Sequence, residues 1–135
     1  MTTRFRKILL ELPPWILTGI TLVAILWLTL SPRPFGSLHT PFFPGADKLA
    51  HALMFGFLVA MMALDRTRKR NFHKLSPLYL ICCAILSSLL GVAIEYLQEA
   101  LHTGRTFEYI DMVADSCGAF ASAFIWLLLQ PKDIE

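Results

Sequence analysis

Charged residues are scarce in this chain of 135 residues: only 16% are Asp, Glu, Lys or Arg, and the formal net charge is +2. Nucleic-acid-binding domains usually carry a strongly basic patch, so the composition gives no support to that class. Hydrophobic residues make up 56% of the chain, above the roughly 45 to 50% of soluble globular domains. The scarcity of charge therefore indicates a membrane protein.

The sequence also lacks the pattern of a cysteine-based metal or redox site. Its three cysteines, Cys82, Cys83 and Cys117, fall in apolar segments without C-x-x-C spacing, which favours small packing residues. No nucleophile stands beside a base on a shared helix face. Ser116 directly follows Asp115, so the two side chains are expected to face different directions. Catalysis through a covalent nucleophile is not indicated.

Four apolar windows approach the roughly 20 residues that a membrane-spanning helix needs. They lie at residues 15–30, 49–64, 78–97 and 109–129. The connections between them leave no room for a second domain, so residues 1–135 are expected to form one. The predicted fold is an all-α integral membrane bundle of four transmembrane helices. Pro13 and Pro14 are expected in the first turn of the first helix, where missing N–H donors cost little.

The basic residues are clustered between the apolar windows, and their distribution predicts the orientation. Cytoplasmic loops of membrane proteins are enriched in Lys and Arg. Nine of the twelve basic residues precede the first window, separate the second from the third, or follow the fourth: Arg4, Arg6, Lys7, Arg66, Arg68, Lys69, Arg70, Lys74 and Lys132. Both termini and the segment 65–76 are therefore expected in the cytoplasm. That segment is interpreted as a surface loop that sets topology and contacts anionic lipid.

Polar side chains concentrate at the opposite, extracytoplasmic ends of the predicted helices. Ionisable groups in a membrane segment cost roughly 2.5 to 3.5 kcal/mol each at the helix centre and indicate function by default. Residues three and four apart lie on the same helix face, so the polar residues within each segment are expected to face the same way. The polar set comprises Asp47, Lys48, His51, Glu95, Gln98, Glu99, His102, Arg105, Glu108, Asp111 and Asp115. Three segments distant in sequence are therefore expected to form one polar site.

Acidic side chains outnumber basic ones in this set, and like charges at low dielectric cannot all stay ionised. Protonated carboxylates, a network with Lys48 and Arg105, or a bound cation would each resolve the excess. His51 and the carboxylates suit a divalent metal, although no HExxH-type spacing is present. The sequence leaves these three alternatives open.

Short motifs distributed over most of the chain carry a family resemblance. They are Ser31-Pro32, Asp47-Lys48-x-x-His51, Glu95-x-x-Gln98, Gly104-Arg105-x-Phe107, Asp111 and Gly118-Ala119. Together they resemble the VanZ-like family, named for a teicoplanin-resistance protein. Asp115 stands where this family usually has Asn, and Ser122 where Gly is common. The resemblance implies a multi-pass protein of the bacterial inner membrane that faces the cell envelope and is linked to glycopeptide resistance, but it supplies no reaction.

Two functions follow from these observations, and the sequence does not decide whether the protein is an enzyme. In the first, an outer-leaflet site binds or acts on an envelope lipid or lipid-linked headgroup. Glu95 and Asp111 are then the catalytic candidates, and Lys48 and Arg105 would bind a phosphate or carboxylate. In the second, the polar cluster only locks the helices, at about 1 kcal/mol per contact, or serves a partner. The candidate binding residues are Asp47, Lys48, His51, Glu95, Gln98, Arg105, Asp111 and Asp115.

Overall fold

The computed structural model describes residues 3–32, 43–102 and 107–130, and within these ranges all regular structure is α-helical. The helices are α1 (Thr3–Glu11), α2 (Ile16–Leu30), α3 (Ala46–Lys69), α4 (Pro77–Ala100) and α5 (Tyr109–Leu129). In the described ranges α3, α4 and α5 are long and apolar enough to cross a membrane. The prediction of an all-α chain with long apolar helices is confirmed.

The first apolar helix, α2, is shorter than the other three. Its 15 residues extend about 22 Å, whereas the hydrocarbon core of a bilayer is about 30 Å thick. A fourth membrane span therefore stays a prediction.

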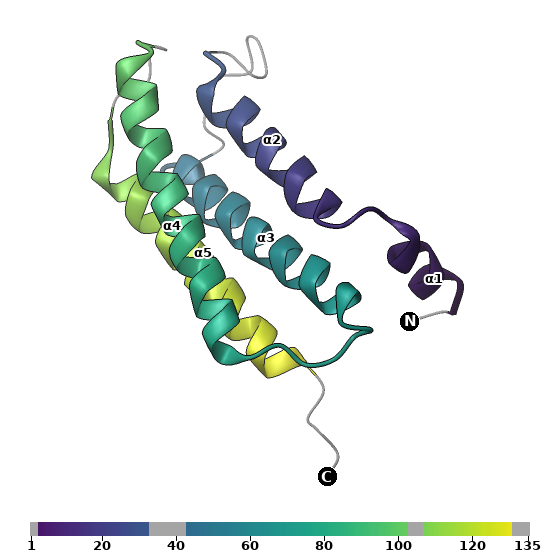
Figure 1. Ribbon diagram of the computed structural model, residues 1–135. Helices are drawn as coiled ribbons and strands as arrows, with labels where there is room; N and C mark the ends of the chain where they lie inside the picture. The colour runs from purple at the N-terminus through teal and green to yellow at the C-terminus, as the bar shows by residue number, and fades with distance from the viewer. Residues whose placement is uncertain (1–2, 33–42, 103–106, 131–135) are drawn as a thin grey trace.

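The long helices form a bundle in which α5 packs against both α3 and α4 (Figure 1). α2 runs alongside and contacts α3 and α4, while α1 lies beyond the bundle and contacts α3. Near the other end of the chain, Gln130 exchanges two hydrogen bonds with the backbone of Leu75, at 3.0 and 3.1 Å. Leu75 lies in the α3–α4 connection. Both ends of the described chain therefore lie at the same end of the bundle.

Small residues hold α3 and α5 close together. A Cβ atom built on Gly118 would lie 1.9 Å from the backbone oxygen of Ala52, so no other residue type fits this crossing. Close approach through small residues is a common way of packing membrane helices. His51 on α3 and Asp115 on α5 lie within one helical turn of this crossing.

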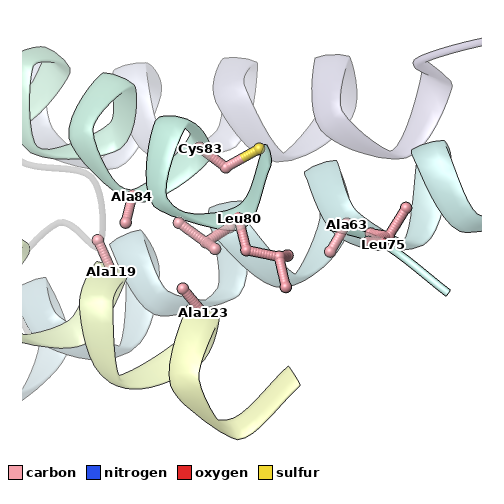
Figure 2. Packing of buried hydrophobic residues seen from close by; sticks show 8 residues of the cluster. Ala63, Leu75, Leu80, Cys83, Ala84, Ala119 and Ala123 are labelled. Atoms are coloured by element: carbon pink, nitrogen blue, oxygen red, sulfur yellow. The ribbon is translucent and has the colours of Figure 1, made fainter. Parts of the chain in front are cut away.

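One of two apolar core clusters in the described residues lies toward the other end of the bundle, where α3, α4 and α5 meet (Figure 2). Its buried members are Val59, Ala63, Leu75, Leu80, Cys83, Ala84, Ala119 and Ala123. Cys83 packs here among apolar side chains and is a free thiol. Many large apolar residues on α3, α4 and α5 instead point outward, as expected for helices that face lipid.

The beginning of the chain differs from the sequence prediction. An additional helix, α1, ends at Glu11, and α2 begins only at Ile16. Pro13 and Pro14 therefore separate two helices, and their placement in the first turn of the apolar helix was wrong. Each proline lacks an N–H donor and restricts the residue before it. Trp15 completes the break with a left-handed backbone, φ 61°.

The segment 65–76 was predicted to be a surface loop, and this is wrong for its first five residues. α3 continues to Lys69, and both Asp65 and Arg68 are buried. Their side chains form an ion pair, with Arg68 Nε 2.8 Å from Asp65 Oδ1. Residues three apart share a helix face, so the spacing of Asp65 and Arg68 was compatible with this pair. The sequence did not distinguish Arg68 from the surface cations around it.

The buried pair, Asp65 with Arg68, fastens the first two helices to α3. Arg68 Nη1 donates to the carbonyl oxygens of Leu9 and Leu12, at 3.0 and 2.8 Å. These carbonyls lie at the end of α1, where helical partners are missing. Asp65 Oδ2 accepts hydrogen bonds from the backbone N–H and the hydroxyl of Thr18, at 2.9 and 2.8 Å. Arg68 is therefore a structural group, not a cation available to lipid headgroups.

Candidate functional site

The start of α3, the last turns of α4 and the start of α5 meet at one end of the bundle. Asp47 and Asp111 lie in the first turns of α3 and α5, where a carboxylate complements the helix dipole. The helix dipole alone would explain these two acids if both were exposed. Asp111, however, is buried together with His51, Glu95 and Asp115, and such a group of ionisable side chains needs mutual compensation.

Lys48 is the cationic centre of the partly exposed half of this site. Its Nζ lies 2.7 Å from Asp47 Oδ2 and 2.7 Å from Asp111 Oδ1, and it also pairs with Glu108 Oε2. The contact with Asp111 is an ion pair whose angles do not meet the criteria of a hydrogen bond. An ammonium group has three N–H donors, and three carboxylates surround this one. Lys48 is therefore engaged as a counter-ion to all three carboxylates.

His51 is the centre of the buried half. Its Nδ1 lies 2.9 Å from Asp115 Oδ1, and its Nε2 lies 3.8 Å from Asp111 Oδ2. An ionised carboxylate can only accept a hydrogen bond, so with Asp115 ionised this contact places a hydrogen atom on Nδ1. The other ring nitrogen, Nε2, then faces a second carboxylate at a distance too long for a hydrogen bond.

Glu95 approaches the same point from α4. Its Oε2 accepts a hydrogen bond of 3.1 Å from the backbone N–H of Glu108. The residue is 0% exposed, yet its Oε1 has no hydrogen-bond partner in the described part of the chain. His51, Glu95 and Asp111 each offer one ligand atom, and these three atoms lie within 4.8 Å of one another. A carboxylate oxygen is thus held next to an imidazole and a second carboxylate.

Other members of the predicted polar set lie elsewhere. Gln98 is buried but donates to the backbone oxygen of Thr29 at 2.7 Å, which ties α4 to α2. Glu99 is exposed, and His102 lies beyond the end of α4 with φ 48°. The prediction that His102 shares the helix face of Glu95 is wrong, because the helix ends at Ala100. Glu99 does lie one turn from Glu95 within α4, but its side chain is exposed, whereas Glu95 is buried.

Two further residues complete the comparison with the sequence prediction. Arg105 lies outside the described residues, so its expected place in the site is untested. Glu108 was absent from the candidate binding residues, although it pairs with Lys48 and its N–H binds Glu95. Its position three residues before Asp111, directly preceding α5, was the signal that could have identified it.

An open groove of about 550 Å³ begins next to the buried half of the site, between α3 and α5. Ala52 and Gly118 line it and are close in sequence to His51 and Asp115. The remaining lining residues are Leu53, Gly56, Phe57, Ala60, Cys117, Ala121, Ser122 and Ile125. The lining is almost wholly apolar, and none of the charged residues of the site belongs to it.

The chain matches a known protein family along most of its length. The model of the VanZ/LLP1 family matches residues 3–130. The chain belongs to the VanZ/LLP1 family. No curated protein and no solved structure matches it. Membership of the VanZ/LLP1 family, with three long apolar helices in the described residues, identifies a membrane protein.

The contact between Asp115 and His51 does not require a carboxylate. The oxygen of an Asn side chain, the residue that the family resemblance led us to expect here, can accept a hydrogen bond from His51 Nδ1 in the same way. The orientation of the histidine ring is thus compatible with either residue. Asp115 differs from Asn in placing an ionisable group in a buried position.

Proposed function

We propose that this VanZ/LLP1 protein is a multi-pass protein of the bacterial inner membrane that binds or acts on an envelope lipid or lipid-linked headgroup. In this proposal α2 is the fourth span, both termini are cytoplasmic, and the polar site faces the outer leaflet. The cation distribution of the sequence supports this orientation. The placement of α1 and Gln130 at the same end of the bundle is consistent with it.

One observation carries the proposal: the buried charged cluster and an apolar groove involve neighbouring residues of α3 and α5. A lipid headgroup requires polar partners, and its chains require an apolar surface. His51 and Asp115 belong to the cluster, while the neighbouring Ala52 and Gly118 belong to the groove. A lipid with its headgroup at His51 could therefore extend its chain between α3 and α5.

The second candidate is a non-enzymatic scaffold whose polar cluster locks the helices or serves a partner protein. The hydrogen bond from Gln98 to Thr29 and the ion pairs of Lys48 favour it, because each joins two helices. Glu95 Oε1, which has no hydrogen-bond partner among the described residues, does not favour it. Buried polar groups that serve only to join helices are normally hydrogen-bonded, so a free carboxylate oxygen indicates a ligand.

The replacement Glu95→Gln separates the two candidates. Gln keeps the shape and the acceptor for the Glu108 N–H but cannot ionise. If the charge of Glu95 serves a ligand, cells that produce this variant should lose the protein's effect on teicoplanin susceptibility, with normal amounts of folded protein in the membrane. A scaffold would tolerate the change.

Glu99→Gln is the matched control, since it makes the same charge change one turn away on an exposed residue. It should leave the teicoplanin phenotype unchanged. Full activity of Glu95→Gln, or a loss fully explained by lower abundance or thermal stability, would leave the scaffold as the better proposal.

A further inference from the structure

The buried half of the site has the composition of a metal centre. We propose that His51 Nε2, Glu95 Oε1 and Asp111 Oδ2 bind one divalent transition-metal ion. One ligand atom from each residue lies within 4.8 Å of the others. Metal–ligand bonds of about 2.0 to 2.2 Å require only a small closure of this triangle. Three protein ligands leave a coordination position open for water or a ligand oxygen, as in catalytic zinc sites.

The arrangement around each proposed ligand supports this assignment. His51 Nδ1 is held by Asp115 at 2.9 Å, Glu95 Oε2 by the Glu108 N–H at 3.1 Å, and Asp111 Oδ1 by Lys48 at 2.7 Å. In each of these three residues, one nitrogen or oxygen atom is held by a neighbouring group, and the second nitrogen or oxygen atom remains to bind the ion. Carboxylate–histidine–metal triads have this form, in which the outer carboxylate fixes the ring orientation and tautomer.

The unpaired oxygen of Glu95 is an independent sign of a ligand. Glu95 is 0% exposed, and its Oε1 has no hydrogen-bond partner in the part of the chain that the structure describes. Leaving a buried acceptor unsatisfied costs about 1 to 3 kcal/mol, and more for a charged group. A cation between this oxygen, Asp111 and His51 removes that cost and offsets the repulsion between the carboxylates.

A second acidic set at this end of the bundle does not compete for the ion. Asp47, Glu108 and Asp111 also offer three oxygen atoms in close proximity. The ammonium group of Lys48 already contacts all three residues and neutralises part of their charge. The buried triangle receives no such cation from the described residues, and Asp111 contributes one oxygen to each half.

The donor atoms indicate which ions fit. An imidazole nitrogen with two carboxylate oxygens suits Zn²⁺ or Mn²⁺. Ca²⁺ prefers six to eight oxygen ligands, and Mg²⁺ is held mainly by carboxylates, water and phosphate oxygens. Zn²⁺ and Mn²⁺ are therefore expected to bind more tightly than Mg²⁺ or Ca²⁺.

The test measures binding to the purified full chain in detergent, without any lipid substrate. The protein is stripped with a chelator and titrated with Zn²⁺ and Mn²⁺ by calorimetry, and with Co²⁺, whose visible absorption reports its coordination. We expect one ion per chain and a rise in the unfolding temperature on binding. Failure of the lipid proposal would leave this result unaffected, since the ion is measured directly.

Near-isosteric replacements locate the ion. Glu95→Gln and Asp111→Asn each remove one charged ligand and should weaken binding by more than the roughly 10- to 100-fold that loss of an outer partner costs. Glu99→Gln is the matched control and should bind as tightly as the unchanged protein. Absence of saturable binding in the unchanged protein, or equal affinity in Glu95→Gln, would overturn the proposal. Binding lost in Glu108→Gln but retained in Glu95→Gln would also overturn it, because the ion would then lie beside Lys48.

Asp115 is a positioning residue in this proposal. Asp115→Ala should weaken binding about 10- to 100-fold, as expected for loss of the group that orients a ligating histidine. Asp115→Asn keeps an acceptor for Nδ1–H and should restore most of the affinity and the Co²⁺ spectrum. Equal loss in both variants would show that Asp115 does not act by orienting His51.

Discussion

Gly118 is the residue at which the smallest change should have the largest effect on packing. A Cβ at this position would lie 1.9 Å from the backbone oxygen of Ala52, and backbone cannot move aside without separating the helices. Gly118→Ala should therefore lower stability by about 1 to 3 kcal/mol, as overpacking does. The measurement is thermal or denaturant unfolding of the purified protein in detergent.

Gly19→Ala is the control for this prediction. A Cβ on Gly19 would meet nothing within 4 Å, and Ala is favoured over Gly in a helix by about 0.5 to 1 kcal/mol. This variant should be as stable as the unchanged protein or slightly more so. Equal stability of the two variants would mean that α3 and α5 are not in close contact at Gly118.

Gly91 tests the site without changing any charge. A Cβ on this residue would lie 2.5 Å from Asp115 Oδ2 and 3.0 Å from its Cβ, so Asp115 must shift, which disturbs its contact with His51. If the proposed link to teicoplanin susceptibility holds, Gly91→Ala should weaken that effect at normal membrane abundance, because the histidine ring loses its orientation. Unchanged susceptibility, with Asp115→Ala impaired, would show that α4 can move to make room.

At the scale of the helices, the buried pair formed by Asp65 and Arg68 determines how α1 and α2 attach to α3. Arg68→Met removes the donor that binds the α1 carbonyls and leaves Asp65 buried without its cation. Breaking one partner of a buried pair costs roughly 3 to 5 kcal/mol. A large drop in the denaturation midpoint is therefore expected for this variant.

Two further variants define the cause of that drop. Lys69→Met changes an exposed neighbour and should have little effect. The double variant Asp65→Leu with Arg68→Met should recover part of the stability, since no isolated charge remains in the interior. A double variant less stable than Arg68→Met alone would attribute the effect to the hydrogen bonds of Asp65 with Thr18 instead.

At the scale of the whole molecule, the orientation in the membrane can be tested at its two ends. His73 is exposed in the α3–α4 connection, and Ala100 is exposed at the end of α4. Single cysteines at these positions are introduced after Cys82, Cys83 and Cys117 are replaced by Ala. The proposed orientation predicts that an impermeant thiol reagent labels Ala100→Cys in intact cells, and His73→Cys only after lysis. The reverse pattern would place the polar site in the cytoplasmic leaflet.

The sequence alone determined that this is an all-α membrane protein and approximately where its long helices lie. The length and hydropathy of α3, α4 and α5 are local properties of consecutive residues, and the backbone in a membrane must satisfy its hydrogen bonds within each helix. Pro77 stands at the start of α4 for an equally local reason, since proline favours the first turn of a helix. The family motifs and the collection of polar residues at one end of the bundle followed from the same kind of reasoning.

Only the tertiary structure decided which polar atoms meet. Hydropathy does not fix the rotation of one helix against another, so it could not direct Lys48 to three carboxylates, His51 to Asp115 and Gln98 to α2. Nor could it distinguish buried Arg68 from the surface cations around it. These partners depend on how closely the helices pack, and Gly118 permits close packing where α3 and α5 cross. Pairing across helices is set by that packing, whereas helix formation is set by each segment of sequence.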